Sequence, residues 1–357
     1  MKKILFVVLL TFAGSLHACT GMKLVAKDGS FVHGRTLEFG IPVDISCVVF
    51  PRGYHFRGTT PLGNGLSYTS KYAAVGAIAF GNPALMDGMN EKGLAVGTFY
   101  FPTFAGYAEI TPQNQSRALS PAEFPNWIVT QFATVDEVQK ALKDVLIAPT
   151  VIQQWGSTVA PFHYVVYDKS GRTLVIEPIN GKLVTHDNPL GTFTNSPSFD
   201  WHMTNLRNYI NLTPFNAMPV SVDGIEFKSL GEGSGMVGIP GDFTPPSRFV
   251  RAAVYTCTAT PSDNAEQAVY QLFHLLNQFD IPVGVARAKE GDAMHTDKTQ
   301  ITCVRDPQEL KYYFKTYNDQ AIKVIDLQKF DWKATKMKAL NVTAVNKAED
   351  VSSKLTE

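Results

Sequence analysis

Short blocks of alternating apolar and polar residues recur along the chain, and turn-forming residues separate them. Such alternation is typical of half-buried β-strands, because successive side chains of a strand point to opposite faces. The first two blocks meet at Asp28-Gly29, a dipeptide that favours a tight hairpin. The pattern predicts strand pairs at 19–26 with 31–39, 72–80 with 94–101 and 163–167 with 173–177, and late strands at 300–305, 310–316 and 322–326.

Runs with helical periodicity lie between these strand blocks, and two of them follow a capping box. The expected helices are 138–147 after the pair Thr134 and Glu137, 268–279 after the pair Asp263 and Glu266, and 247–255. Hairpins that alternate with helices predict an α+β fold in which helices cover the outer faces of the sheets.

The first residues follow a different pattern. Lys2 and Lys3 precede an apolar run over 4–12, and small residues then lead to Ala18 and Cys19. A basic start, a short apolar core and a small residue at the cut are typical of a secretory signal peptide. The run is too short to span a bilayer, which takes about 20 apolar residues.

The domain organisation follows from this leader. We expect residues 1–18 to be a signal peptide and residues 19–357 to form a single domain, exported to the periplasm or secreted. The polar end of the chain, about 15 residues from Thr343, is expected to be loose. No later segment reaches membrane-spanning length without charges, so no membrane span is expected.

The residues before Cys19 allow more than one fate for its thiol. Leu16-His17-Ala18-Cys19 resembles an ordinary cleavage site, and it equally resembles a lipoprotein processing box. Ordinary cleavage leaves a free thiol beside a free amine, whereas lipidation blocks both and gives a lipid-anchored, catalytically inactive envelope lipoprotein. Cleavage elsewhere in the leader leaves Cys19 internal, and then an inert protein is expected unless a further self-cleavage exposes it.

Composition and charge exclude several classes of function. Lysine plus arginine equals aspartate plus glutamate at 32 each, which does not suggest a nucleic-acid partner. The chain has no phosphate loop, no nucleotide glycine fingerprint, no Gly-x-Ser-x-Gly elbow and no convincing metal-ligand spacing. We therefore expect no cofactor and no metal. Cys47, Cys257 and Cys303 are expected to be buried apolar thiols rather than disulfide partners.

Cys19 is the strongest candidate for chemistry. If its own α-amine is free, that amine is a base with a pKa of roughly 8, and it lies beside a thiol with a pKa of roughly 8.5. The neutral fraction of the amine can accept the thiol proton and so activate the nucleophile. A thiolate attacking an amide carbonyl then needs charged groups that hold the amine and thiol, and donors that stabilise the oxyanion.

Five motifs, in order along the chain, resemble those of the choloylglycine hydrolases, the penicillin V acylases and bile salt hydrolases among the N-terminal nucleophile hydrolases. The matching segments are Cys19-Thr20-Gly21 with 34–39, 87–94, 191–197 continuing through 199–209, 240–243 and 247–253. The resemblance covers essentially the whole chain after the leader. It implies a four-layer αββα sandwich of two antiparallel sheets covered by helices, and by family analogy a homotetramer.

The resemblance assigns roles to residues around the nucleophile Cys19. Arg35 matches the arginine that favours the thiolate, and Arg248 matches the second arginine near it. Glu38 stands where the family normally has aspartate, the carboxylate that contacts the N-terminal amine. The extra methylene of Glu38 moves its carboxylate by about a bond length, a displacement of the order that can be costly in catalysis.

The oxyanion hole and the substrate wall are also implied by the resemblance. Asn195 matches the asparagine whose amide helps form the oxyanion hole, and the backbone N–H of Tyr100 supplies the second donor. Phe99, Tyr100 and Phe101 are expected to wall an apolar pocket for the acyl group. His163 is interpreted as a core histidine, and His202 as structural.

The implied activity is hydrolysis of a linear amide bond in a small-molecule N-acyl compound through an acyl-enzyme. Tyr100 stands where penicillin V acylases have tyrosine and many bile salt hydrolases have asparagine, and it therefore favours the acylase type. Conjugated bile salts and N-acyl homoserine lactones are the alternative substrates.

Overall fold

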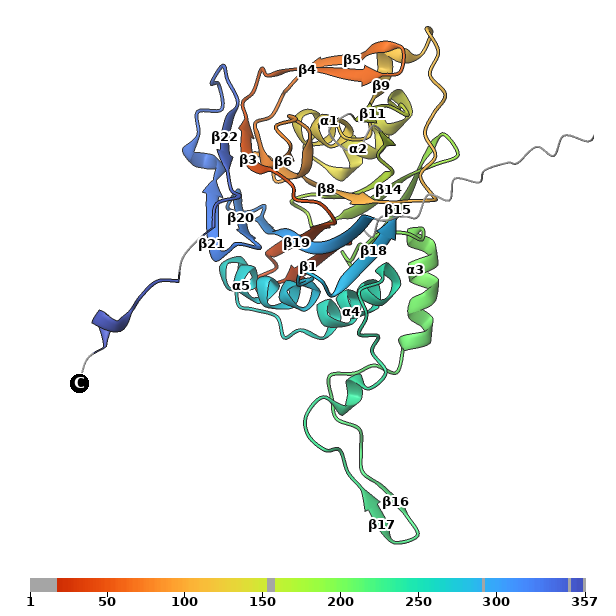
Figure 1. Cartoon of the computed structure of the whole chain (residues 1–357), viewed down its shortest axis with the longest axis vertical. Helices are drawn as coiled ribbons and strands as arrows, with labels where there is room; N and C mark the ends of the chain where they lie inside the picture. The colour runs from red at the N-terminus through yellow and green to blue at the C-terminus, as the bar shows by residue number, and fades with distance from the viewer. Residues whose placement is uncertain (1–17, 153–157, 291–292, 346–347, 356–357) are drawn as a thin grey trace, which may run out of the picture.

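The computed structural model describes residues 18–357 except 153–157, 291–292, 346–347 and 356–357. The expected signal peptide, residues 1–18, therefore lies outside the described residues apart from Ala18. Two antiparallel sheets pack face to face, and helices cover both outer faces (Figure 1). The four-layer αββα sandwich implied by the sequence is confirmed. No helix in the described ranges is long and apolar enough to cross a membrane.

The first sheet contains both strands of the hairpin on which the candidate site lies. Its path runs through β1 (Cys19–Val25), β2 (Phe31–Phe39), β19 (Ala293–Asp306), β20 (Lys311–Thr316) and β21 (Asp319–Asp326), and β18 (Ala286–Glu290) also pairs with β19. The hairpin predicted at Asp28-Gly29 is confirmed, with Cys19 opposite Leu37 and Val25 opposite Phe31. The register of β1 and β2 therefore brings the first residue of one strand beside the charged end of the other.

The second sheet supplies the opposite wall of the interior. Its order is β15 (Lys182–Asp187), β14 (Thr173–Ile179), β13 (Phe162–Tyr167), β8 (Ala95–Tyr100), β7 (Leu85–Asn90), β6 (Ala74–Ala79), β3 (Ile45–Phe50) and β22 (Lys338–Asn341). The predicted pairing of residues 72–80 with 94–101 is wrong, because β7 lies between them. Alternation did not reveal β7, whose sequence LMDGMN mixes polar residues and glycine yet is buried throughout.

Four helices form the outer layers. The helices α4 (Pro245–Thr258) and α5 (Ala265–Leu276) cover the first sheet, and α1 (Phe124–Gln131) and α2 (Val135–Ala141) cover the second. Thr134 caps α2 as predicted, but the helix ends at Ala141 and not at 147. The cap of α5 is Asn264, one residue later than the predicted Asp263.

The remaining elements are short and lie outside the two sheets. They are β4 (His55–Thr60), β5 (Gly63–Thr69), β9 (Ala118–Leu119), β10 (Leu146–Ile147), β11 (Val151–Ile152), β12 (Thr158–Val159), α3 (Phe199–Asn205), β16 (Val220–Val222) and β17 (Ile225–Phe227). The β16–β17 hairpin projects far from the sandwich (Figure 1). The described residues after Asn341 contain only a single 3-10 turn, at Ser352–Lys354.

Strand alternation divides the first sheet into two environments. On β1 and β2 the side chains of Cys19, Arg35 and Leu37 face the interior between the sheets, and Met22 and Val32 pack beneath α5. Residues that are neighbours in sequence therefore approach the start of β1 from opposite sides.

Candidate active site

The candidate nucleophile lies at the start of β1 and is 5% exposed. The Ala18–Cys19 peptide bond is intact, and the Ala18 carbonyl accepts a hydrogen bond of 2.9 Å from the Glu38 N–H. The nitrogen of Cys19 is thus an amide nitrogen here, and it donates to Asn195 Oδ1 at 2.8 Å. The structure therefore describes Cys19 as part of a continuous backbone.

A small pocket opens at the thiol, with a cavity of about 30 Å³. Most of its wall is apolar. The lining residues are Cys19, Arg35, Leu37, Glu38, Phe39, Val43, Ala79, Phe80, Met86, Thr98, Tyr100 and Phe162. The wall therefore combines the nucleophile and its two charged neighbours with aliphatic and aromatic side chains, a combination suited to an apolar group attached to a polar bond.

Arg35 lines the same pocket as the thiol, on the interior side of β2. Its guanidinium is 1% exposed, and Nη1 donates to the carbonyls of Thr98 at 2.5 Å and Met86 at 3.1 Å. The guanidinium carbon lies 4.2 Å from the centre of the Phe99 ring, a cation–π distance. These contacts hold the positive charge of Arg35 on the face of the second sheet that is turned toward Cys19.

Arg248 approaches from α4 on the other side of β1. Its Nη1 donates to the Cys19 carbonyl at 2.5 Å and to Thr20 Oγ1 at 2.9 Å. Burial raises the pKa of the Cys19 thiol, and the positive charges of Arg35 and Arg248 act against that rise. Two cations from different layers therefore converge on one buried thiol.

Asn195 links three elements through its side-chain amide. Its Oδ1 accepts from the Cys19 nitrogen and from Arg248 Nη2, the latter at 2.8 Å, and its Nδ2 donates to the Tyr100 carbonyl at 2.9 Å. Because Arg248 can only donate, it forces the oxygen of the amide toward itself and the nitrogen toward Tyr100. An amide nitrogen carries two N–H groups, so Nδ2 can donate a second hydrogen bond besides the one to Tyr100.

Glu38 is buried, at 1% exposure, on the helix-covered side of β2. Its Oε1 accepts from Thr299 Oγ1 at 3.0 Å, and within the described part of the chain Oε2 has no hydrogen-bond partner. Burial raises the pKa of Glu38 to about 8, although the nearby charges of Arg248 and Arg35 lower it. A surface ion pair with Arg35 is excluded because both side chains are buried.

A second layer of contacts holds the backbone around Asn195. His202 Nε2 donates to the Asn195 carbonyl at 2.9 Å, and His163 Nε2 lies 3.0 Å from the Thr194 carbonyl. His163 also contacts Glu177, which accepts from the Phe199 N–H at 3.0 Å. Burial lowers the pKa of His202 to about 4. The interpretation of both histidines as structural agrees with these contacts.

The structure brings together Cys19, Arg35, Glu38, Tyr100, Asn195 and Arg248, the six residues singled out for catalysis. It separates the residues expected in the acyl wall. Tyr100 lines the pocket, whereas Phe99 packs under Arg35 and Phe101 stacks on His163 with ring centres 4.1 Å apart. The motifs did not identify Val43, Phe80 or Met86 as pocket residues, although Met86 directly precedes the motif over 87–94.

The other three cysteines differ in their exposure. Cys47 and Cys303 are buried and unpaired, as expected, but Cys257 is exposed at the end of α4, so that part of the expectation is wrong. No group of three or more histidine, cysteine, aspartate or glutamate side chains is placed to hold a metal ion within the described ranges.

Comparisons with known proteins agree with this geometry. Residues 19–340 match the family model of linear amide C–N hydrolases, the choloylglycine hydrolase family. A bile salt hydrolase/transferase of Clostridium perfringens is 33% identical over 314 residues, which cover 87% of this chain and 93% of that protein. A penicillin V acylase of Pectobacterium atrosepticum is 28% identical and covers 84% and 78%.

Solved structures show the same likeness. A variant of the conjugated bile acid hydrolase from Clostridium perfringens superimposes with a TM-score of 0.84 at 30% identity, covering 94% of this chain and 100% of that one. A penicillin V acylase from Agrobacterium tumefaciens gives a TM-score of 0.73 at 25% identity and covers 90% and 91%.

Proposed function

Because this chain belongs to the choloylglycine hydrolase family of linear amide C–N hydrolases, we propose that it hydrolyses N-acyl amides by means of the Cys19 thiolate. The observation that carries the proposal is that polar groups from several parts of the chain surround Cys19. Its nitrogen contacts Asn195, its carbonyl contacts Arg248, and its thiol shares a pocket with Arg35. Each of these three groups of Cys19 thus has a polar neighbour from a different part of the chain.

The reaction begins once the Ala18–Cys19 bond is cut. The free α-amine takes the thiol proton, and the thiolate attacks the carbonyl carbon of the substrate amide. The second N–H of Asn195 and the backbone N–H of Tyr100 stabilise the oxyanion. The ammonium then returns a proton to the leaving nitrogen, and water hydrolyses the thioester to free the acid and regenerate the thiol.

Glu38 holds the amine in this proposal. Its Oε2 has no hydrogen-bond partner among the described residues, and it lies beside the strand end at which the ammonium forms. A free ammonium is the partner that a buried carboxylate needs, and it favours the ionised form of Glu38. The proposal includes export and removal of residues 1–18, for which the basic and apolar pattern of the leader is the support.

For the acyl group we propose an apolar, aromatic-bearing chain of the penicillin V type. The support is the aromatic and aliphatic wall, in which Phe80, Tyr100 and Phe162 take part, and the tyrosine at position 100. Conjugated bile salts are the second candidate, because the Clostridium perfringens relative is more similar to this chain than the Pectobacterium acylase is. N-acyl homoserine lactones are the third candidate class of substrate.

The test is a panel of these three substrate classes with release of the amine as readout. We expect hydrolysis, fastest with penicillin V, and its loss in Cys19→Ala. Cys257→Ala is the matched control, because this thiol is exposed on α4, and it is expected to keep full activity. Activity that persists in Cys19→Ala would refute the nucleophile, and a diacylglyceryl mass on Cys19 would support the inactive lipoprotein instead.

The proposal extends to assembly into a homotetramer. The projecting hairpin exposes the apolar side chains of Val220, Val222, Ile225 and Phe227, each more than half exposed. Apolar surface of this extent usually marks an association site. Light scattering on the mature protein is expected to give four times the mass of one chain, and a monomer at all concentrations would contradict the assembly.

A further inference from the structure

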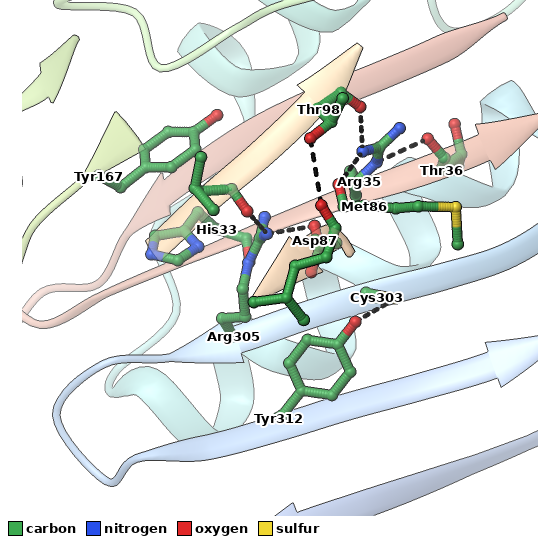
Figure 2. Close-up of polar contacts among 12 residues, drawn as sticks. His33, Arg35, Thr36, Met86, Asp87, Thr98, Tyr167, Cys303, Arg305 and Tyr312 are labelled. Carbon is green, nitrogen blue, oxygen red and sulfur yellow. Dashed lines mark hydrogen bonds and ion pairs between the residues drawn. The ribbon is translucent and has the colours of Figure 1, made fainter. Parts of the chain in front are cut away.

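Three charged side chains lie in the interior between the two sheets, behind the nucleophile. Arg35 comes from β2, Arg305 from β19 and Asp87 from β7, and each is 1% exposed. Figure 2 shows Asp87 between the two guanidinium groups. Burial of ions at this depth costs free energy unless each charge is compensated, so the pairing among the three groups is informative.

Asp87 forms its ion pair with Arg305. Arg305 Nη1 donates to Asp87 Oδ2, and Arg305 Nε approaches the His33 carbonyl at 3.4 Å. The guanidinium carbon of Arg305 also lies 5.9 Å from the centre of the Tyr167 ring. Arg305 is therefore oriented by two strands and an aromatic ring, and its charge is matched by one carboxylate.

Arg35 lies next to the same carboxylate without pairing with it. Its Nη1 donates to the carbonyl of Met86, the residue before Asp87, and to the carbonyl of Thr98 on β8. Arg35 Nη2 and Asp87 Oδ1 are both buried, and neither has a hydrogen-bond partner among the residues described. Arg305 thus holds one oxygen of the Asp87 carboxylate and leaves the other without a hydrogen bond among the described residues.

The neighbouring titratable groups leave the charge count unchanged. Burial lowers the pKa of His33 well below its usual value and raises the pKa values of Cys303 and Tyr312 well above theirs, so all three are neutral. These groups, with Tyr167, surround Asp87 (Figure 2). Among the residues labelled in Figure 2, the charged side chains are thus Arg35, Arg305 and Asp87.

The charged groups that face the Cys19 thiol complete the account. They are Arg35 and Glu38 on β2 and Arg248 on α4. Arg248 already has hydrogen bonds to Phe243, Cys19, Thr20 and Asn195. Neither Arg35 nor Arg248 forms an ion pair with a carboxylate among the described residues, and Arg35 is the one of the two that borders the thiol pocket.

We propose that Arg305 is a positioning residue for the nucleophile: by holding the Asp87 carboxylate, it leaves the charge of Arg35 to the Cys19 thiolate. This inference rests on the proposed function, because it explains how the thiolate is stabilised in that reaction. Arg305 does not touch the substrate or the thiol. Its effect passes through Asp87 to Arg35, and the two members of the ion pair therefore act on the thiol in opposite directions.

The test measures the pKa of the Cys19 thiol in the mature protein from the pH dependence of iodoacetamide alkylation, followed by mass of the N-terminal peptide. Asp87→Asn removes the competing anion and is expected to lower the thiol pKa by about 1. Arg305→Met releases Asp87 toward Arg35 and is expected to raise it by about 1. The double variant is expected to return close to the wild-type value.

The control and the refuting outcomes separate charge from damage. Tyr312→Phe removes the 2.9 Å hydrogen bond to Cys303 Sγ in the same interior without changing charge, and no change in thiol pKa is expected. Shifts of the same sign in both single variants, or no shift in Asp87→Asn, would overturn the proposal. If Arg305→Met does not fold, the Asp87→Asn result still decides.

Failure of the inference and failure of the proposed function give different results. Alkylation requires no substrate, so the thiol pKa values can follow the prediction even if no N-acyl amide is hydrolysed. In that case the proposed function fails and the account of Arg305 stands. Hydrolysis with unchanged thiol pKa values in both single variants leaves the function intact and refutes the inference.

Discussion

The protonation of Glu38 gives the sharpest stability prediction for the uncut chain. In that form the Cys19 nitrogen is an amide, and burial raises the pKa of Glu38 from 4.5 to about 8. Between these two values the folded chain binds a proton that the unfolded chain does not. The contribution of Glu38 is therefore fully present below pH 4.5 and is lost as the pH rises toward 8.

The magnitude follows from the linkage relation. One bound proton changes the free energy of unfolding by about 1.4 kcal/mol per pH unit, so roughly 2.7 kcal/mol of the Glu38 contribution is lost between pH 5.5 and 7.5. Glu38→Gln removes the titration and keeps an oxygen that can accept from Thr299. The free energy of unfolding of wild type minus that of Glu38→Gln is expected to fall by this amount.

Urea unfolding at pH 5.5, 6.5 and 7.5 measures the difference on chains produced without export. Other groups that titrate in this range, such as Asp297 with a pKa raised by burial to about 7, are present in both chains and cancel in the difference. In the mature form the ammonium of Cys19 keeps Glu38 ionised, and the slope is expected to disappear. A difference that is equal at all three pH values in the uncut chain would refute the reasoning.

Three further predictions address catalysis and packing. Glu38→Asp is expected to keep activity and Glu38→Ala to lose most of it; full turnover of an N-acyl amide by Glu38→Ala would remove its role. Asn195→Ala removes an oxyanion donor, and kcat is expected to fall by about 10²–10³-fold in steady-state assays; an unchanged kcat would contradict that role. Gly76→Ala places a Cβ 2.1 Å from the Asp87 carbonyl and is expected to cost about 3 kcal/mol of unfolding free energy, against less than about 0.5 kcal/mol for Gly231→Ala in open space; equal losses would refute the packing argument.

Local patterns predicted the elements that local physics determines. The first hairpin, the pair β13 and β14 and the helix α4 were predictable because turn residues and alternation lie within a few residues of each other. The strand β7 was not predictable, because Asp87 and two further polar or flexible positions interrupt its apolar pattern. The charge of its buried Asp87 is compensated by an ion pair with Arg305, which is more than 200 residues away in sequence.

The candidate site shows the same division. Motifs identified Arg35, Glu38, Asn195 and Arg248. They did not show that Arg35 and Glu38 lie on opposite faces of β2. Phe99, Tyr100 and Phe101 were expected together in the acyl wall, yet successive residues of a strand cannot all face one pocket. Only Tyr100 of the three lines it.

The acyl-enzyme on the mature N-terminus is the most direct test of the account. The mature protein is mixed with an N-acyl amide, quenched in acid and digested. The mass of the peptide from Cys19 to Lys23 is then measured by mass spectrometry. The account predicts an unmodified free N-terminus before reaction and one acyl group on Cys19 after it. An N-terminus at another residue, a lipid on Cys19, or an acyl group carried elsewhere in the chain would contradict it.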